Sequence, residues 1–458
     1  MIRFCIAALL IPMTFATVAQ DEHLKWAGHV ALPNGQQMPL ELEVFKTPHT
    51  TTANVRSPAQ GVQNIPVTAF RQTVNTLSMQ LPTLGAALQL QPNNEGCLAG
   101  ALNQGMALPV ELCPTQSLTH DDYLASLPEG VTELDELRFQ SADGSWLSGT
   151  LYQPVNQPQA PVVILSGGSG ASDRDGSFAG KKPYRNFGIE LAKQGIALFT
   201  FDKRGVRRSG GDYTQATVEQ YAQDIQAAYQ LIRSMKAINP EKIGFVGHSE
   251  GATVVAMALA EVNADFVISL GGVGLNGIDA IVLQDKTESM ARGASAEQAE
   301  VLQQIAREYY AIVLNAPDDK AREQQAKAWL ASLSEQQRDV YQQYGADTYT
   351  LAVDNVNDKA LFSILATDPT QHWQRVCVPA LILNGDKDVQ VPAVENVAGL
   401  EQALASCRHP ATKVKILANY NHMLQPTTDG NIELYAELPE GFDENLSTDI
   451  AAWIRRLR

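Results

Sequence analysis

Residues 242–260, KIGFVGHSEGATVVAMALA, carry the strongest structural signal in the sequence. An apolar strand-like run leads into Gly247, Ser249 and Gly251, and an apolar helix-like run follows them. Strand, G-x-S-x-G and helix in this order are typical of a nucleophile elbow, a strained turn that exposes the serine hydroxyl and needs small residues around it. The stretch therefore predicts Ser249 as a nucleophile, in preference to an ordinary turn serine.

Similar apolar runs alternate with helical segments throughout residues 132–458. The strand-like runs include PVVILSGG, IALFTFD, ADFVISLGG, PALILNGD and TKVKIL, and an amphipathic segment spans VEQYAQDIQAAYQLIRSM. This alternation predicts an α/β fold with a mostly parallel sheet flanked by helices. A hairpin about Asp143 and Gly144 is expected to open the domain. A closing helix on the sheet is predicted from the helical spacing of Leu446, Ile450, Trp453, Ile454 and Leu457.

Between the predicted strands at 265–271 and 380–384, the alternation stops for about a hundred residues, although most connections in such folds are short. The inserted segment is rich in Ala, Gln and Glu, as in SAEQAEVLQQIAREYYAIVL, and this composition favours helices. We expect a helical cap at about 276–372 that covers the carboxyl edge of the sheet. A solvated helical appendage is the alternative.

A serine hydroxyl is a weak nucleophile until a base accepts its proton, and in the elbow architecture the partners follow in the order serine, acid, histidine. His372, His409 and His422 come after Ser249. His372 precedes the best acid, and His409 precedes a strand at the opposite edge of the sheet. His422 follows the strand TKVKIL at the carboxyl edge, so it is the predicted base.

The acid is expected on a loop at the carboxyl end of a strand, and NGDKD, which follows PALIL, offers Asp386 and Asp388. Asp388 lies far enough past the strand to turn back over the sheet edge, so it is the predicted acid, and Asp386 is expected to cap the turn. Asp388 would hold the imidazole in the tautomer that accepts the serine proton. The predicted oxyanion donors are the backbone N–H groups of Glu250 and of Ser169 in the glycine-rich SGGSG loop.

Charged residues surround the predicted site. Asp173 and Asp175 are separated by Arg174, which makes a poor cage for a cation, so an internally paired loop is the favoured interpretation. The Glu250 side chain is expected to pair with Arg174 or Arg204 and thereby to shape the oxyanion loop. No metal or organic cofactor is predicted.

The amino-terminal part of the chain follows another pattern. Residues 1–19 combine one charge at Arg3, a short apolar stretch and small residues before Ala19, which predicts a cleaved signal peptide instead of a membrane anchor. Residues 20–113 alternate apolar and polar side chains between frequent turn residues, so a small all-β domain, a barrel or a sandwich, is expected. A polar linker at 114–131 follows it.

Four cysteines remain after this cleavage, and an even number in an exported chain indicates disulfides more readily than a metal site. Cys97 with Cys113 and Cys377 with Cys407 are the predicted local bridges, and four free buried thiols are the alternative. The mature protein is expected to be soluble and periplasmic or secreted.

The composition excludes some partners. Of the 458 residues, 45% are hydrophobic and 18% are charged, which is typical of a globular protein with packed cores. A formal net charge of −16 would repel a phosphate backbone over most of the surface. Neither nucleic acid binding nor stable membrane insertion is therefore expected.

Five motifs together resemble those of bacterial α/β-hydrolase carboxylesterases with a GHSEG elbow. They are SGGSGASDRDG from Ser166, DKRGVRRSGGDY from Asp202, GHSEG from Gly247, NGDKDVQVP from Asn384 and NYNHMLQP from Asn419. The resemblance covers residues 132–458 and implies an α/β-hydrolase fold, with a triad and oxyanion positions at Ser249, Asp388, His422, Ser169 and Glu250. Arg207 and Ala252 depart from the family, which commonly has glycine at both places. The segment from Trp26 resembles a β-rich domain often fused before bacterial ester hydrolases.

The expected activity is hydrolysis of a small-molecule carboxylic ester through an acyl-enzyme. A serine peptidase or amidase, or an acyltransferase, with the same triad is the alternative, because the residues specify acyl transfer and the pocket selects the leaving group. A cell-envelope ligand-binding protein is the noncatalytic alternative. The β-rich domain is expected to be a structural or interaction module.

Overall fold

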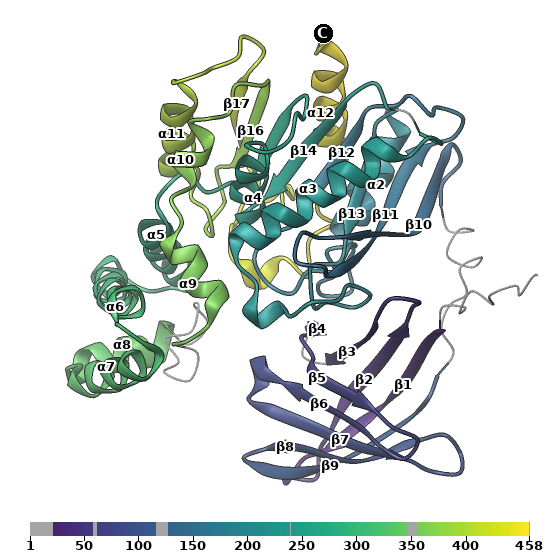
Figure 1. The fold of residues 1–458 in the computed structure, drawn as a ribbon. Helices are drawn as coiled ribbons and strands as arrows, with labels where there is room; N and C mark the ends of the chain where they lie inside the picture. Colours follow the sequence, from purple (N-terminus) through teal and green to yellow (C-terminus); the bar gives the residue numbers. More distant parts are fainter. Residues whose placement is uncertain (1–21, 58–61, 116–126, 239, 346–355, 458) are drawn as a thin grey trace, which may run out of the picture.

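The protein forms two sheets in the computed structural model (Figure 1). The residues described are 22–57, 62–115, 127–238, 240–345 and 356–457. The predicted signal peptide, residues 1–19, lies outside this part of the chain. Within the described ranges, no helix has both the length and the apolar character needed to cross a membrane.

The first sheet is antiparallel throughout, with the strand order β4-β3-β2-β1-β9-β8-β7-β6-β5. Its strands are β1 (Glu22–Ala31), β2 (Gln37–Lys46), β3 (Thr51–Ser57), β4 (Val62–Ile65), β5 (Thr68–Gln72), β6 (Leu77–Leu81), β7 (Ala86–Pro92), β8 (Leu98–Gln104) and β9 (Met106–Pro114). Alternate side chains are buried, as in β7, where Leu88 and Leu90 face the core and Gln89 faces solvent. The predicted all-β domain is therefore confirmed.

The topology gives the expected barrel or sandwich the form of an open half-barrel. Hairpins join β1 to β4 in one series and β5 to β9 in another, and β1 pairs with β9, so the two series fuse into one sheet. All nine strands contribute to a single core. The domain is one curved sheet with β4 and β5 at its edges in the described residues (Figure 1).

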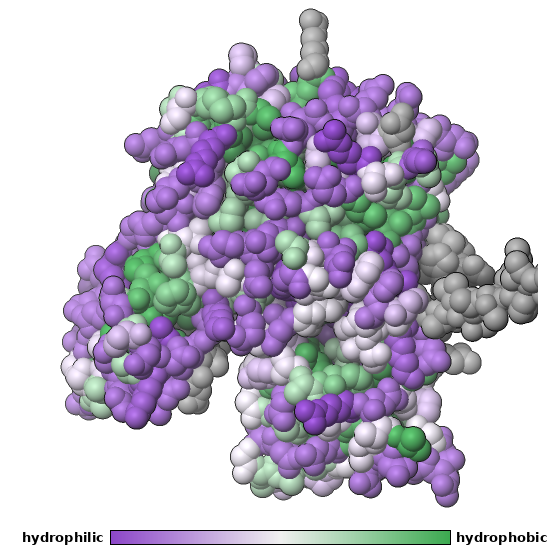
Figure 2. Space-filling model, viewed as in Figure 1, coloured by the Kyte–Doolittle hydropathy of each residue, from purple (hydrophilic) through white to green (hydrophobic). Residues whose placement is uncertain are grey.

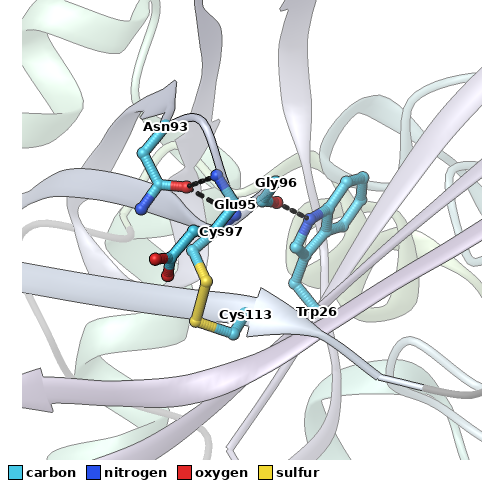
Figure 3. The surroundings of a disulfide bond; sticks show 6 residues. All are labelled: Trp26, Asn93, Glu95, Gly96, Cys97 and Cys113. Carbon is cyan, nitrogen blue, oxygen red and sulfur yellow. Dashed lines mark hydrogen bonds between the residues drawn. A yellow bond between two sulfur atoms is a disulfide. The ribbon is translucent and has the colours of Figure 1, made fainter.

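Two disulfides are present with the predicted pairing, Cys97–Cys113 and Cys377–Cys407. The first joins the residue before β8 to β9 (Figure 3). In the same turn, the indole N–H of Trp26 donates to the carbonyl of Gly96 at 3.1 Å, which ties the turn to β1. The second bridge joins the segment before β16 to the turn that follows α11.

The second sheet has the strand order β10-β11-β13-β12-β14-β15-β16-β17. The strands are β10 (Val131–Gln140), β11 (Trp146–Pro154), β12 (Val162–Ser166), β13 (Ala197–Phe201), β14 (Ile243–His248), β15 (Val267–Leu270), β16 (Ala380–Gly385) and β17 (Lys413–Leu417). The predicted hairpin forms β10 and β11, which are antiparallel, and from β13 onward the neighbours are parallel. Every residue of β12 and β14 is buried, as continuous apolar runs predict.

Helices cover both faces of this sheet. Ile164 of β12 belongs to one core, and its neighbours Val163 and Leu165 belong to the other. The first core packs against α3 (Val218–Ser234), α4 (Glu250–Ala258), α10 (Pro369–Trp373) and α11 (Ala393–Leu404), and the second packs against α2 (Pro183–Lys193) and α12 (Glu444–Arg456). The five apolar residues from which the closing helix was predicted all lie in the second core, so that prediction is confirmed. This is the predicted α/β-hydrolase architecture.

The insertion between β15 and β16 is helical, as predicted. Its helices are α5 (Gly277–Ala291), α6 (Ala296–Asn315), α7 (Asp319–Ser332), α8 (Glu335–Tyr344) and α9 (Lys359–Ala366). They share a core of their own, and α5 and α9 lie between the other three and the sheet edge (Figure 1). In Figure 2 most of this face of the molecule is hydrophilic, and one of its apolar patches lies over the insertion near α5.

The two sheets meet at the loop after β13. The guanidinium of Arg207 lies 3.7 Å from Glu43 Oε1 of β2 and 3.5 Å from Asp173 Oδ2, and its backbone carbonyl accepts a hydrogen bond from Thr52 of β3. Burial acts in the opposite direction, but Arg207 holds the pKa of Glu43 well below its usual range. Arg207 has φ 45°, a conformation that favours glycine. Arg207, at a position where the resembled family commonly has glycine, thus forms a contact with the β-rich domain.

Candidate active site

Ser249 occupies the turn between β14 and α4. Its backbone angles, φ 56° and ψ −126°, are strained for a residue with a side chain, and its N–H donates to the carbonyl of Leu270 at 2.9 Å. A β-carbon added at Gly247 would lie 2.2 Å from the carbonyl oxygen of Gly251, and one at Gly251 would lie 2.1 Å from that of Ser166. The two motif glycines are therefore required for the backbone to turn this tightly.

The structure brings His422 and Asp388 together. Nδ1 of His422 lies 2.7 Å from Oδ2 of Asp388, and both residues are buried. The other carboxylate oxygen, Oδ1, accepts the backbone N–H groups of Gln390 at 2.9 Å and Val391 at 2.7 Å, so the carboxylate is fixed on both sides. With Nδ1–H donated to Asp388, Nε2 is the ring nitrogen able to accept a proton.

The alternatives considered from sequence lie elsewhere. Asp386 is exposed, and its Oδ1 accepts the backbone N–H of Asn419 at 2.7 Å, so it stabilises the neighbouring loop. His409 accepts the backbone N–H of Ala411 at 3.1 Å, before β17. His372 lies in the short helix α10.

The glycine-rich loop packs directly on the nucleophile. A β-carbon on Gly168 would lie 3.1 Å from Cβ of Ser249, so glycine permits the close approach. Ser169 and Glu250, the residues predicted to supply the oxyanion donors, line the same cavity as Ser249. Glu250 is the first residue of α4, where backbone N–H groups point out of the helix and attract negative charge.

The prediction that the Glu250 side chain pairs with Arg174 or Arg204 is wrong. Its Oε2 lies 3.2 Å from Nζ of Lys203. Both arginines are engaged by other carboxylates: Arg174 with Asp202 and Asp135 at 2.8 Å each, and Arg204 with Asp224 and Asp143 at 2.6 Å each.

The prediction that the charges of Asp173, Arg174 and Asp175 pair within this segment is wrong. Asp173 contacts Arg207, and Asp175 lies 2.7 Å from Nζ of Lys182, so each charge finds its partner outside the segment. In the part of the chain that the structure describes, no three His, Cys, Asp or Glu side chains are placed to hold a metal ion.

A buried hydrogen-bond chain that sequence reasoning missed connects the two halves of the site. The N–H of Gly168 donates to the hydroxyl of Tyr184, which lies 3.1 Å from Nδ1 of His248, and Nε2 of His248 lies 3.0 Å from the carbonyl of His422. The carbonyl can only accept, so Nε2 carries the proton and Nδ1 accepts from the tyrosine. Burial raises the pKa of Tyr184 to about 12, which keeps it a donor. No local sequence signal marks this pair, which is separated by 64 residues.

The neutral state of His248 predicts a loss of stability in acid. Burial, and secondarily His422, lowers the pKa of His248 from 6.5 to about 3. Between these values the unfolded chain binds the extra proton, so the free energy of unfolding should fall as the pH falls, by up to about 1.4 kcal/mol per pH unit. His248→Gln removes this titration and should lose less stability than the wild type between about pH 6.5 and 5.

Urea unfolding at several pH values measures the effect. His409→Gln, which removes a half-buried histidine away from the site, is the matched control. Equal slopes for the wild type and His248→Gln would contradict the prediction.

A cavity that opens to solvent adjoins Ser249. Its apolar wall is formed by Val218, Val273, Ala280, Ile281, Ile364 and Val391. Helices α5 and α9 of the insertion thus cover the site, as expected of a cap. Among the described residues that line this cavity, only Glu250 is charged, and Lys203 compensates that charge.

Residues 156–426 match the sequence model of the family described as serine aminopeptidase, S33. The match covers more than half of the chain and includes the elbow and the His422 to Asp388 pair, whereas the antiparallel domain lies outside it.

Individual proteins that are similar to this chain share a low sequence identity with it. The chain is 27% identical over 149 residues to a polyketide transferase of Penicillium crustosum. The aligned stretch covers 30% of this chain and 44% of the transferase, so the chain spans less than half of the length of this relative. An esterase of Pyrococcus furiosus aligns over 75% of this chain and 96% of its own, with 16% identity and a TM-score of 0.45. The esterase domain of a Rhodothermus marinus protein aligns over 71% and 98%, with 16% identity and a TM-score of 0.39.

Proposed function

The chain belongs to the serine aminopeptidase S33 family, and from that premise we propose that it is an exported serine hydrolase that cleaves carboxylic esters. One observation carries the proposal: the buried His422 to Asp388 pair, 2.7 Å apart, lies at the same sheet edge as Ser249 on its strained elbow. The order serine, acid, histidine is the one that this fold uses.

In the proposed reaction, Oγ of Ser249 attacks the ester carbonyl while Nε2 of His422 accepts its proton. The N–H groups of Ser169 and Glu250 stabilise the oxyanion. The intermediate collapses, the C–O bond to the alcohol breaks, and His422 returns the proton to the leaving alcohol. Water, activated by the same histidine, then attacks the acyl-enzyme, releases the acid and restores Ser249.

The cavity lining favours an ester with an uncharged acyl group. A free amino terminus would need an unpaired carboxylate in the pocket, and the carboxylate of Glu250 already pairs with Lys203. Apolar side chains on α5 and α9 instead offer burial to an alkyl or aryl acyl chain. The disulfides support export, because such bridges persist in oxidising compartments, and we therefore place the mature protein in the periplasm or outside the cell.

The test is hydrolysis of p-nitrophenyl esters from acetate to laurate beside peptide anilides, with Ser249→Ala as the background. Ester turnover is expected, and Ile281→Trp, which fills the cavity, should lower kcat/KM for the longer esters at least about tenfold relative to acetate. Met290→Trp is the matched control, because Met290 lies on the same helix and is 43% exposed. An unchanged chain-length profile in Ile281→Trp would contradict the assignment of the acyl pocket.

Other outcomes would redirect the proposal. Turnover of anilides alone would indicate a peptidase, and faster product formation with an added alcohol acceptor would indicate an acyltransferase. Absence of serine-dependent turnover with every substrate would favour a ligand-binding protein.

A further inference from the structure

We infer that Lys203 is a positioning residue for the oxyanion hole, an inference that rests on the proposed function. Its ammonium group holds the carbonyl of Gly168 and the carboxylate of Glu250 together. It thereby aims the backbone N–H groups of Ser169 and Glu250 at the carbonyl oxygen of the bound ester.

Lys203 is buried in the loop after β13, with a side chain only 8% exposed. Nζ lies 2.6 Å from the carbonyl oxygen of Gly168, 3.2 Å from Oε2 of Glu250 and 4.5 Å from the centre of the Tyr221 ring. A buried ammonium is costly unless its charge is compensated, and a carbonyl dipole, a carboxylate and an aromatic face supply that compensation. The ammonium is therefore held by the groups that surround the nucleophile.

The contact with Gly168 determines where the next N–H points. The carbonyl of Gly168 and the N–H of Ser169 belong to one planar trans peptide, so they point in opposite directions. With the carbonyl directed at Lys203, the N–H points away from Lys203, and Ser169 lines the cavity that contains Ser249. A cation on the carbonyl also polarises the peptide and makes its N–H a stronger donor.

The contact with Glu250 removes an electrostatic conflict. A carboxylate on the residue after the nucleophile would repel the negative charge that develops on the substrate. Lys203 neutralises this carboxylate and links the start of α4 to the oxyanion loop. The backbone N–H of Lys203 also donates to the carbonyl of Ser172 at 3.1 Å, so the loop is held at two points.

The test uses the full-length protein and its best ester substrate. Lys203→Met is expected to lower kcat about 10²-fold, the loss typical of one missing oxyanion donor, with KM changed by less than about threefold. The affinity for a boronic acid that mimics the tetrahedral intermediate should fall by the same factor as kcat. Lys242→Met is the matched control, because Nζ of Lys242 donates to the carbonyl of Leu457 at 2.5 Å, at the opposite end of β14. Wild-type kcat and inhibitor affinity in Lys203→Met would overturn the inference.

A double variant separates positioning from charge neutralisation. Lys203→Met with Glu250→Gln leaves no unpaired carboxylate beside the nucleophile, so its fold is protected. If Lys203 positions Gly168, the double variant keeps the loss of about 10² in kcat and in inhibitor affinity. Recovery of wild-type kcat would show that Lys203 only neutralises Glu250 and would overturn the inference. Failure of the proposed function is a separate observation, namely ester turnover that survives Ser249→Ala.

Discussion

Ser249→Ala is expected to reduce kcat for the best ester about 10⁵- to 10⁶-fold, because no other group can form the acyl-enzyme. The elbow should persist, since the strained backbone at this position is held by the close contacts of Gly247 and Gly251 and not by the hydroxyl. The residual rate should still exceed that of the uncatalysed reaction, because the oxyanion donors and the pocket remain.

Steady-state hydrolysis and mass spectrometry after treatment with a fluorophosphonate measure this loss. One covalent adduct on Ser249 is expected in the wild type and none in the variant. Ser234→Ala is the matched control, because this serine lies at the end of α3 and its hydroxyl bonds the carbonyl of Leu231. An adduct that persists in Ser249→Ala would assign the nucleophile elsewhere.

Asp388→Asn is expected to lower kcat about 10⁴-fold with little change in KM. The N–H groups of Gln390 and Val391 would hold the amide oxygen of the new side chain where Oδ1 now lies. The amide NH₂ would then face Nδ1 of His422, which must accept and leaves the proton on Nε2. The imidazole would be in the wrong tautomer to receive the serine proton.

Asp386→Asn provides the matched control two residues away. Its carboxylate is exposed and accepts only the N–H of Asn419 among the contacts described, so ester kcat should remain near that of the wild type. The unfolding temperature of Asp388→Asn should lie within a few degrees of that of the wild type, because the hydrogen bonds from the N–H groups of Gln390 and Val391 are kept. If Asp386→Asn were the inactive variant, the assignment of the acid would be contradicted.

The sequence allowed the three residues of the proposed triad to be placed at one sheet edge, because each of them follows a strand that the apolar pattern marks. Parallel strands bring their carboxyl ends to one edge, so chain order alone nearly determines the neighbours of Ser249. Lys203 and Tyr184 could not be found in this way. Their roles depend on side chains that reach across the sheet edge to Gly168, and no periodicity records such contacts.

The pairing of charges was predicted least well. Lys203, Arg204 and Arg174 are all basic and near the site in sequence or space, and composition does not distinguish which of them meets Glu250. Both guanidinium groups are already paired with carboxylates on neighbouring elements, so the carboxylate of Glu250 pairs with Lys203. The β-rich domain shows the same limit, because alternation identifies the buried face of each strand but not how two hairpin series join.

Arg207 contacts Glu43 of the antiparallel domain and Asp173 of the α/β domain, so electrostatic interactions cross the border between the two domains. A shortened enzyme without the antiparallel domain would lose Glu43 and uncover the guanidinium of Arg207, which would keep its contact with Asp173 in the loop beside the nucleophile. An engineer who exchanges this domain for another must therefore supply a carboxylate at the place of Glu43, or replace Arg207 by glycine.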